Sequence, residues 1–445
     1  MNASTPTRAA LALVAAFALA VPAATAAPTV KEFDVPTADT QPTDIANVDG
    51  KLWFVEQVGG KIGRVTPGAP PLIEEFTPPS QAGSMTPING LQDVARGPDG
   101  NVWVSATNVV AKVPPNNPTG GIAYGGLGLA DPRGLAAGPD GNVWVVDAGA
   151  DDVKRVTTAG ALVGSAIELG MGCGPRNIAR GPDQNMWVTC FGNGKVVRIK
   201  GDGSAADPFT LAAGSTPWDI TSGPDGKLWF TGQKHDVSSI TTAGTPKPFT
   251  SKGLDPFGIT VGPDKALWYA EFGDSTIGRV TTAGKTSQLT GLTANSGPRY
   301  IAAGPANTLW FTEQTANKIG RITGVVQPPK PPAKANLAGS KDSVTVNEER
   351  RFTYGFKAGK GLKGRAIFES ARKITVNGEK RKVTFARRSF TVPPSGKVTV
   401  RVRLRKDKFA ILEEKGTVRV RIRVILRNAA GLTSTASRTF KLKAP

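Results

Sequence analysis

The chain has one histidine and two cysteines among its 445 residues, and this scarcity excludes several kinds of site. A zinc site needs three or four Cys, His or carboxylate ligands in close spacing, and a lone His with two Cys gives no such constellation. Long apolar runs are also lacking, because the run from Ala9 to Val21 is too short to span a membrane and no later segment is longer. The sequence therefore predicts neither a Cys/His zinc centre nor a transmembrane segment.

The N-terminus has the pattern of a secretion signal. Arg8 precedes the apolar run, and the small residues Ala24-Thr25-Ala26 form a cleavage site. We therefore expect a signal peptide over residues 1–26 and a secreted protein, either extracellular or associated with the cell envelope.

The two cysteines, Cys173 and Cys190, lie at the two ends of one predicted hairpin. The ends of a hairpin are close in space, and an oxidising compartment permits a bridge. A disulfide is the favoured prediction, and two free buried thiols are the alternative.

One sequence motif recurs roughly every forty residues. It reads Gly-Pro-Asp-Gly-Asn-Val-Trp at 97–103, with similar copies at 138–144, 181–187, 223–229 and 262–268, a diverged copy at 304–310 and another that ends at Trp53. Pro and Asp-Gly supply a tight turn, and the residues around Trp favour a strand. The Asp fits this turn better than a calcium site. Seven such units predict a seven-bladed β-propeller over residues 28–326.

Each unit reads as four strands. In the fifth unit we expect them at 217–222, 227–231, 239–241 and 247–250, with the turn at 223–226. The last unit has no fourth strand before the chain becomes Pro-rich. The segment 30–36 resembles an outer strand, so we expect it to pair with the last unit and close the ring.

Residues 336–445 form a second region with a different charge. They contain 28 Lys and Arg against 8 Asp and Glu, a net charge of +20, whereas residues 1–335 carry 27 of each. The Pro-rich segment 327–335 is typical of an extended linker. Apolar residues alternate with arginine at 398–405 and 418–424, and a helical turn ending at Gly416 is expected between them. This predicts a small immunoglobulin-like β-sandwich, loosely similar to basic modules appended to secreted bacterial proteins.

If the two Arg-rich strands are neighbours, they form one basic face. A partner for such a face would be an anionic polymer of the cell envelope. Nucleic acid is disfavoured because no aromatic residues interleave with the arginines. A solvated, charge-biased surface with no partner is the alternative.

Two further motifs recur in the propeller sequence: Leu-Trp-Phe-x-Glu-Gln at 52–57 and 309–314, and Lys-Ile-Gly-Arg-Ile-Thr at 318–323. In these motifs the sequence over residues 28–326 resembles the virginiamycin B lyase family. It implies a seven-bladed propeller and a magnesium-dependent opening of a cyclic depsipeptide. Histidines in the turns that begin the inner strands, and the Glu of Trp-Phe-x-Glu, would form that site at the channel mouth.

The chain departs from this pattern at the histidine positions. The corresponding turns contain Phe257 and Arg299, neither of which can act as a base near neutral pH. Glu271 and Glu313 keep the acidic positions and are the candidates for catalysis and for magnesium. His235 lies in a loop on the same face and is a weaker candidate for a base.

The residues at the histidine position of the seven units would surround one end of the channel. In chain order they are Thr43, Gln92, Arg133, Arg176, Trp218, Phe257 and Arg299. The acidic position contributes Glu56, Asp147, Glu271 and Glu313. An ion-pair network between these acids and the three arginines is one interpretation. The other is a pocket for a small ligand or peptide that carries a carboxylate or phosphate, with Trp218 and Phe257 as an aromatic wall.

Three functions are consistent with these patterns. The leading hypothesis is ligand binding at the channel mouth without the family's histidines. A lyase or hydrolase that uses Glu271 or Glu313 with magnesium is the second. The third is a scaffold that binds other proteins through the loops of the propeller.

Overall fold

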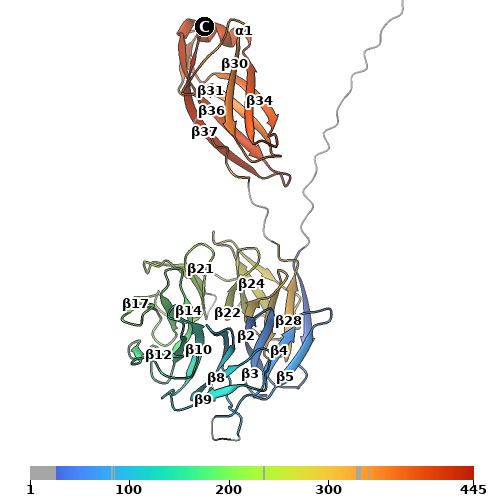
Figure 1. Ribbon diagram of the computed structural model, residues 1–445, viewed down its shortest axis with the longest axis vertical. Coiled ribbons are helices and arrows are strands. Elements are labelled where there is room, and N and C mark those ends of the chain that lie inside the picture. The colour runs from blue at the N-terminus through green and yellow to red at the C-terminus, as the bar shows by residue number, and fades with distance from the viewer. Residues whose placement is uncertain (1–26, 82–83, 85, 234–235, 327–331, 339) are drawn as a thin grey trace, which may run out of the picture. The chain divides into compact units, whose positions relative to one another are not determined.

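The computed structural model describes residues 27–81, 84, 86–233, 236–326, 332–338 and 340–445. The predicted signal peptide, part of the predicted linker and His235 lie outside these ranges. The chain divides into two compact units, the propeller unit within 25–327 and the C-terminal unit beyond it (Figure 1). Within the described ranges, no helix has both the length and the apolar character needed to cross a membrane.

The described part of the propeller unit contains seven four-stranded antiparallel sheets. The inner strands are β2 (Pro42–Val48), β6 (Asp93–Arg96), β10 (Pro132–Ala137), β14 (Pro175–Arg180), β18 (Pro217–Ser222), β22 (Pro256–Val261) and β26 (Pro298–Ala303). Each packs against the inner strands of the two neighbouring sheets, and β2 packs against β26, so the ring is closed. This is the seven-bladed propeller that the repeats predicted.

The remaining strands complete each blade outward. The second strands are β3 (Lys51–Glu56), β7 (Val102–Ala106), β11 (Val143–Asp147), β15 (Met186–Cys190), β19 (Leu228–Gly232), β23 (Leu267–Glu271) and β27 (Leu309–Glu313). The third strands are β4 (Ile62–Thr66), β8 (Val109–Val113), β12 (Asp152–Val156), β16 (Lys195–Ile199), β20 (Asp236–Ile240), β24 (Thr276–Val280) and β28 (Lys318–Thr323). The outer strands are β5 (Leu72–Phe76), β9 (Ile122–Tyr124), β13 (Ile167–Glu168), β17 (Ala206–Thr210), β21 (Pro246–Thr250), β25 (Thr286–Leu289) and β1 (Thr29–Asp34).

The N-terminal strand β1 is the outer strand of the last blade. It pairs antiparallel with β28, from Thr29 opposite Thr323 to Asp34 opposite Lys318 (Figure 1). The predicted closure is therefore confirmed, and it leaves no unpaired edge between the first and last blades.

The recurring motif contributes the central residues of each blade interior. The tryptophan of the second strand is buried in all seven blades. In five blades the Asp of the turn accepts a hydrogen bond from the indole N–H, as in Trp144 to Asp140 at 2.9 Å and Trp268 to Asp264 at 2.9 Å. The Asp of the motif therefore accepts the hydrogen bond of a buried indole N–H and also helps to form the turn.

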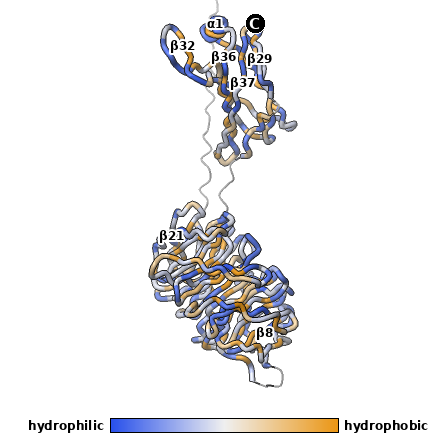
Figure 2. Tube along the Cα trace, turned by 90° about the vertical axis from the view of Figure 1, so that its left-hand side faces the viewer, coloured by the Kyte–Doolittle hydropathy of each residue, from blue (hydrophilic) through white to orange (hydrophobic). Residues whose placement is uncertain are grey.

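The described part of the C-terminal unit contains a five-stranded sheet in the order β29-β37-β36-β31-β34, a two-stranded sheet β30-β35 and a hairpin β32-β33. The bounds are β29 (Ser343–Thr345), β30 (Arg351–Lys357), β31 (Lys363–Ser370), β32 (Ile374–Val376), β33 (Glu379–Arg381), β34 (Thr384–Thr391), β35 (Lys397–Arg403), α1 (Lys406–Lys415), β36 (Thr417–Arg427) and β37 (Thr433–Lys443). The first two sheets enclose one apolar core, in which Tyr354 of β30 packs on Phe440 of β37. Buried and exposed residues alternate along β35 and β36, and Figure 2 shows hydrophobic and hydrophilic residues intermixed along the chain of this unit. The immunoglobulin-like type stays a prediction.

The two Arg-rich strands are not neighbours, so the condition for one shared basic face is not met. β35 pairs with β30 in the two-stranded sheet, whereas β36 pairs with β31 and β37 in the other sheet. Both strands alternate as predicted, with valine inward and arginine outward, because both sheets cover the same core from opposite sides.

Candidate functional site

A small cavity lies where the inner strands begin, and we call it the mouth cavity. It is lined by Thr43, Gln57, Gln92, Asp93, Arg133, Gly134, Arg176, Trp218, Arg299 and Tyr300. The cavity has a volume of about 70 Å³. Four of the five predicted ligand-binding residues therefore share one cavity, and the fifth, Phe257, is buried behind Trp218 with the ring centroids 4.8 Å apart.

The three arginines of the mouth cavity differ in their partners. Arg133 donates to Asp131 at 2.8 Å and to Gln92 at 2.9 Å. Arg299 donates from Nη1 to Gln314 at 2.7 Å, and its buried Nε has no hydrogen-bond partner. The buried Nε of Arg176 also has none. Among the described residues, neither Arg176 nor Arg299 forms an ion pair.

Aromatic rings hold these two arginines in place. The guanidinium of Arg176 lies 4.9 Å from the ring of Phe191 and 4.8 Å from that of Trp218. The guanidinium of Arg299 lies 4.9 Å from Phe257 and 5.9 Å from Trp218. Cation–π contact orients a guanidinium without neutralising it. Burial lowers the pKa of both arginines, and the charge of Arg133 adds to this effect at Arg176, yet a guanidinium remains protonated.

Three buried aspartates follow the mouth residues by one position along the inner strands. Asp44 and Asp219 accept backbone N–H groups of the next blades, from Val94 and Ile259, each at 2.7 Å. Asp93 does the same for Leu135 at 2.6 Å. Burial raises the pKa of all three, and Asp44 raises that of Asp93 further, while Asp219 reaches about 7. These carboxyl groups join neighbouring blades through backbone hydrogen bonds, and their burial favours the uncharged form.

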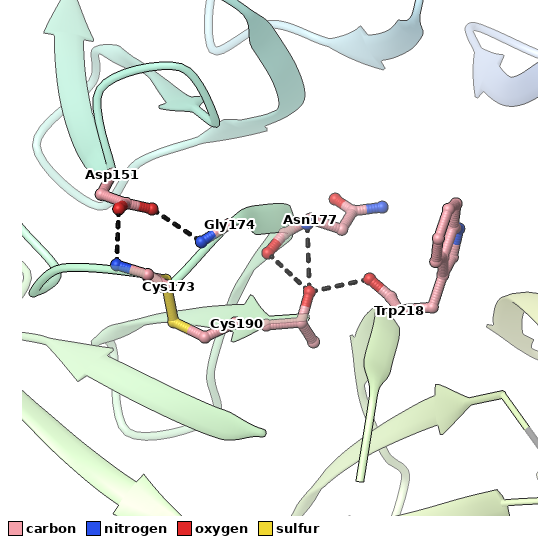
Figure 3. Close-up of a disulfide and its surroundings, with 8 residues drawn as sticks. Asp151, Cys173, Gly174, Asn177, Cys190 and Trp218 are labelled. Atoms are coloured by element: carbon pink, nitrogen blue, oxygen red, sulfur yellow. Dashed lines mark hydrogen bonds between the residues drawn. A yellow bond between two sulfur atoms is a disulfide. The ribbon is translucent and has the colours of Figure 1, made fainter. Parts of the chain in front are cut away.

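Trp218 reaches across the top of the channel. Its indole N–H donates to the Tyr300 hydroxyl at 3.1 Å, which joins the fifth blade to the seventh. Thr189 positions its backbone, because the threonine hydroxyl donates to the Trp218 carbonyl at 2.7 Å and accepts from the Asn177 N–H at 3.1 Å (Figure 3). The tryptophan is therefore a fixed wall of the mouth cavity.

Cys173 and Cys190 form the predicted disulfide (Figure 3). It links the loop before β14 to the end of β15. Asp151 accepts hydrogen bonds from the backbone N–H groups of Gly172 at 2.8 Å and Gly174 at 2.6 Å. These bonds fix the backbone directly before Arg176, and Gly174 adopts a φ of +52° in this turn. The disulfide thus positions a residue of the mouth cavity.

The predicted acids do not lie with the arginines, so the expected ion-pair network is absent from the described residues. Glu271 is buried and accepts hydrogen bonds from the Ser251 hydroxyl, the Gly253 N–H at 2.9 Å, the Thr276 hydroxyl at 2.6 Å and the Gln288 amide at 2.8 Å. Asp147 similarly accepts from the N–H groups of Ala130 and Asp131 and pairs with Lys154. Each acid ties the end of its strand to the loop that precedes its own blade.

Glu56 and Glu313 occupy the same position but are poorly satisfied. Both are fully buried, and their carboxylate oxygens have no hydrogen-bond partner among the described residues. Burial raises the pKa of Glu313 to about 8, with Glu32 raising it further and Ser296 and Lys318 opposing. Burial and then Glu75 raise the pKa of Glu56 to about 7.

The carboxylate of Glu271 and the lining of the mouth cavity do not fit magnesium. The ion prefers six oxygen ligands and one or two free carboxylates. Both oxygens of Glu271 are occupied by four donors, and the mouth cavity presents three guanidinium groups that repel a cation. Among the described residues, no group of three or more His, Cys, Asp or Glu side chains could hold a metal ion.

The residues that directly follow the acidic position also belong to the mouth and were not predicted from the sequence. Gln57 lines the mouth cavity, Gln314 accepts from Arg299, and Phe191 and Phe272 continue the aromatic row with Trp218 and Phe257. The Gln of Leu-Trp-Phe-x-Glu-Gln marked this position. Successive residues of a strand point to opposite faces, so a residue next to a buried acid was the better candidate.

The fold is similar to that of known proteins. A structure described as streptogramin B lyase is 26% identical, covers 66% of this chain and 97% of its own, and has a TM-score of 0.60. Virginiamycin B lyase from Staphylococcus aureus is 25% identical, covers 67% and 99%, and has a TM-score of 0.60. A catalytically inactive His-to-Ala variant of it with quinupristin has a TM-score of 0.59 at the same identity and coverage. A comparison with curated proteins found no match.

The sequence profile described as the virginiamycin B lyase family matches residues 13–168 and 165–328, which is well over half of the sequence. The matched residues include all seven blades and every residue of the mouth cavity. The chain therefore belongs to the virginiamycin B lyase family.

Proposed function

We propose that the propeller binds a small molecule or peptide through one anionic group, a carboxylate or a phosphate, placed between Arg133, Arg176 and Arg299. The observation that carries this proposal is the buried, unpartnered Nε of Arg176 and of Arg299 beside one cavity. A buried donor without an acceptor costs about 1–3 kcal/mol. An oxyanion would accept from both arginines and compensate the like charges that gather at the mouth.

The size of the cavity limits what enters it. A volume of about 70 Å³ is far below the roughly 300–1,000 Å³ of a pocket that encloses a drug-sized ligand. The anionic group alone therefore occupies the cavity, and the rest of the ligand lies outside it. Phe191 and Trp218 at the rim offer apolar surface to that remainder.

Binding without ring opening is favoured by the side chains at the inner-strand turns. Phe257 and Arg299 occupy the two positions where the family resemblance implies histidines, and the S. aureus enzyme is described as inactive when a histidine is replaced by alanine. An elimination needs a group that accepts a proton near the working pH. Phenylalanine and arginine cannot do so.

Calorimetric titration of the full chain at low salt with a tripeptide tests this proposal. We expect binding of the free-acid peptide, much weaker binding of its C-terminal amide, and competition by inorganic phosphate. Arg176→Met or Arg299→Met should weaken binding at least tenfold, because each removes a charge-assisted contact of about 1.5–3 kcal/mol.

The matched control is Arg198→Met, which removes the same charge from a blade surface. Equal affinity in all three variants would show that the peptide binds elsewhere. Incubation with quinupristin and magnesium provides a second readout, because formation of a linear product would overturn the binding-only function.

A further inference from the structure

We propose that the outer face of the five-stranded sheet in the C-terminal unit binds a linear polyphosphodiester of the cell envelope. This surface is separate from the mouth cavity and does not depend on the function proposed for it. We call it the arginine face.

The arginine face is defined by strand register. Residues directly opposite one another in antiparallel strands share a face. Arg419 lies opposite Lys441, Arg423 lies opposite Ile367, and Ile367 lies opposite Arg387. The basic residues that this register places on the face are Lys363, Arg365, Arg387, Arg419, Arg421, Arg423, Arg427, Lys441 and Lys443. Glu369 is on the same face.

The central row of this face is unpaired. Arg419, Arg421 and Arg423 of β36 are exposed, and none of their side chains forms an ion pair or hydrogen bond with a described residue, although Glu369 lies opposite Arg421. The unit does contain acids that pair with other cations, as Glu349 does with Arg351 and Asp342 with Arg438. The charges of the row are therefore available to a partner. Like charges side by side repel one another, and a polyanion would remove that repulsion.

The spacing of Arg419, Arg421 and Arg423 along β36 favours one type of polymer. Alternate residues of a strand are about 6.8 Å apart. In an extended chain three backbone bonds span about 3.3–3.6 Å, so six bonds span about 7 Å. A polymer with one phosphodiester for each three-carbon unit has six backbone bonds per repeat. Successive phosphates can therefore meet Arg419, Arg421 and Arg423 in turn, and each guanidinium can bind two phosphate oxygens.

Single-stranded nucleic acid has the same backbone spacing but needs more than charge. Its binding relies on exposed aromatic side chains that stack on the bases. The aromatic residues of the described C-terminal unit are buried or partly buried, with Phe390 and Phe409 the least covered. The arginine face offers phosphate contacts without a stacking surface, which favours a polymer without bases. The predicted secretion signal would bring the protein to such polymers.

The test compares two triple variants of the full chain in binding to poly(glycerol phosphate). One is Arg419→Gln/Arg421→Gln/Arg423→Gln. The control is Arg351→Gln/Arg401→Gln/Arg403→Gln, which removes equal charge from exposed positions of the two-stranded sheet. We expect the first to lower the slope of log affinity against log salt by about 2, since each phosphate contact contributes about 0.7 on a flexible strand. The control should retain most of the wild-type slope.

Two results would overturn the proposal. Equal losses in the two triple variants would mean that total charge rather than the arginine face drives binding. Tighter binding of single-stranded DNA than of poly(glycerol phosphate) at the same salt would assign the face to nucleic acid. Thermal unfolding of each variant shows whether the sheet is intact, and because the three positions are exposed we expect it to be so.

Discussion

Arg64 and Arg279 on the blade surfaces and Arg176 and Arg299 at the channel mouth all contact aromatic rings but differ in their counter-charges. Arg64 lies 5.4 Å from the ring of Trp53 and pairs with Glu74 at 2.8 Å. Arg279 lies 5.7 Å from Trp268 and pairs with Asp264 at 2.7 Å. Arg176 and Arg299 stack equally closely on aromatic rings yet pair with no described carboxylate.

This difference separates structural charges from available ones. Arg279 completes a closed set of contacts, because its partner Asp264 also accepts a hydrogen bond from the Trp268 indole N–H. Arg176 and Arg299 are oriented by aromatic rings, and the buried Nε of each has no acceptor among the described residues. Removing a blade residue should therefore cost stability, and removing a mouth residue should cost binding.

The largest expected loss of stability comes from replacing a tryptophan, and it should differ between the two regions. Trp187 is fully buried in a blade, whereas Trp218 is part of the mouth wall. Trp187→Ala should destabilise the propeller by about 3–5 kcal/mol, because it leaves a large cavity. Trp218→Ala should cost less stability while weakening peptide binding. Thermal unfolding and titration of both variants measure this, and equal losses of stability would contradict the division.

The disulfide should give the next largest effect. Cys173→Ser/Cys190→Ser opens a loop with a sequence separation of 17, and for a loop of about 15 residues the loss is about 3 kcal/mol. Because Arg176 follows this loop, the double variant should also bind peptide more weakly. A reductant should reproduce the loss in the wild-type protein and leave the double variant unchanged. Full retention of affinity would show that the disulfide does not position the mouth.

The propeller could be predicted from the sequence because its information is local and repeated. Turn residues, the Trp strand and the missing fourth strand of the last unit were enough to predict even the pairing of β1 with β28. The partners of the Arg-rich strands could not be predicted in this way. Alternation shows which face of β35 or β36 is buried, but which strands pair depends on contacts between residues far apart in the sequence.

The residues of the channel mouth could be predicted only in part, for a related reason. Position within the repeat correctly brought Arg133, Arg176, Trp218 and Arg299 together. It placed the acids wrongly, because Glu271 and its equivalents turn toward the loop before their own blade. A shift of one residue along a strand reverses the face, and the repeat alone does not say which face meets the channel.

A smaller effect should follow from exchanging single arginines. Arg279→Met leaves the buried Asp264 without its cation and should cost about 1–3 kcal/mol. Arg176→Met removes an unsatisfied donor and a like charge beside Arg133, so the unliganded protein should be as stable as wild type or more stable. Melting temperatures at low and high salt measure both. A loss of stability in Arg176→Met matching that of Arg279→Met would mean that the mouth arginines are structural.

The smallest expected effect on stability concerns two acids, Glu271 and Glu313. They occupy equivalent positions in their blades, but among the described residues hydrogen-bond donors surround only the carboxylate of Glu271. The folded-state pKa of Glu313, raised to about 8 by burial and by Glu32, exceeds its ordinary value of 4.5. The folded protein therefore holds a proton that the unfolded chain releases between these values, and stability falls as pH rises through this window.

Glu313→Gln should flatten that fall and raise stability above pH 8 by about 1–2 kcal/mol. Glu271→Gln should lower stability, because the amide keeps only one acceptor oxygen for four donors. Unfolding curves from pH 5 to about pH 9 compare the slopes. Parallel curves for Glu313→Gln and wild type would show that Glu313 is ionised in the folded protein and is as well satisfied as Glu271.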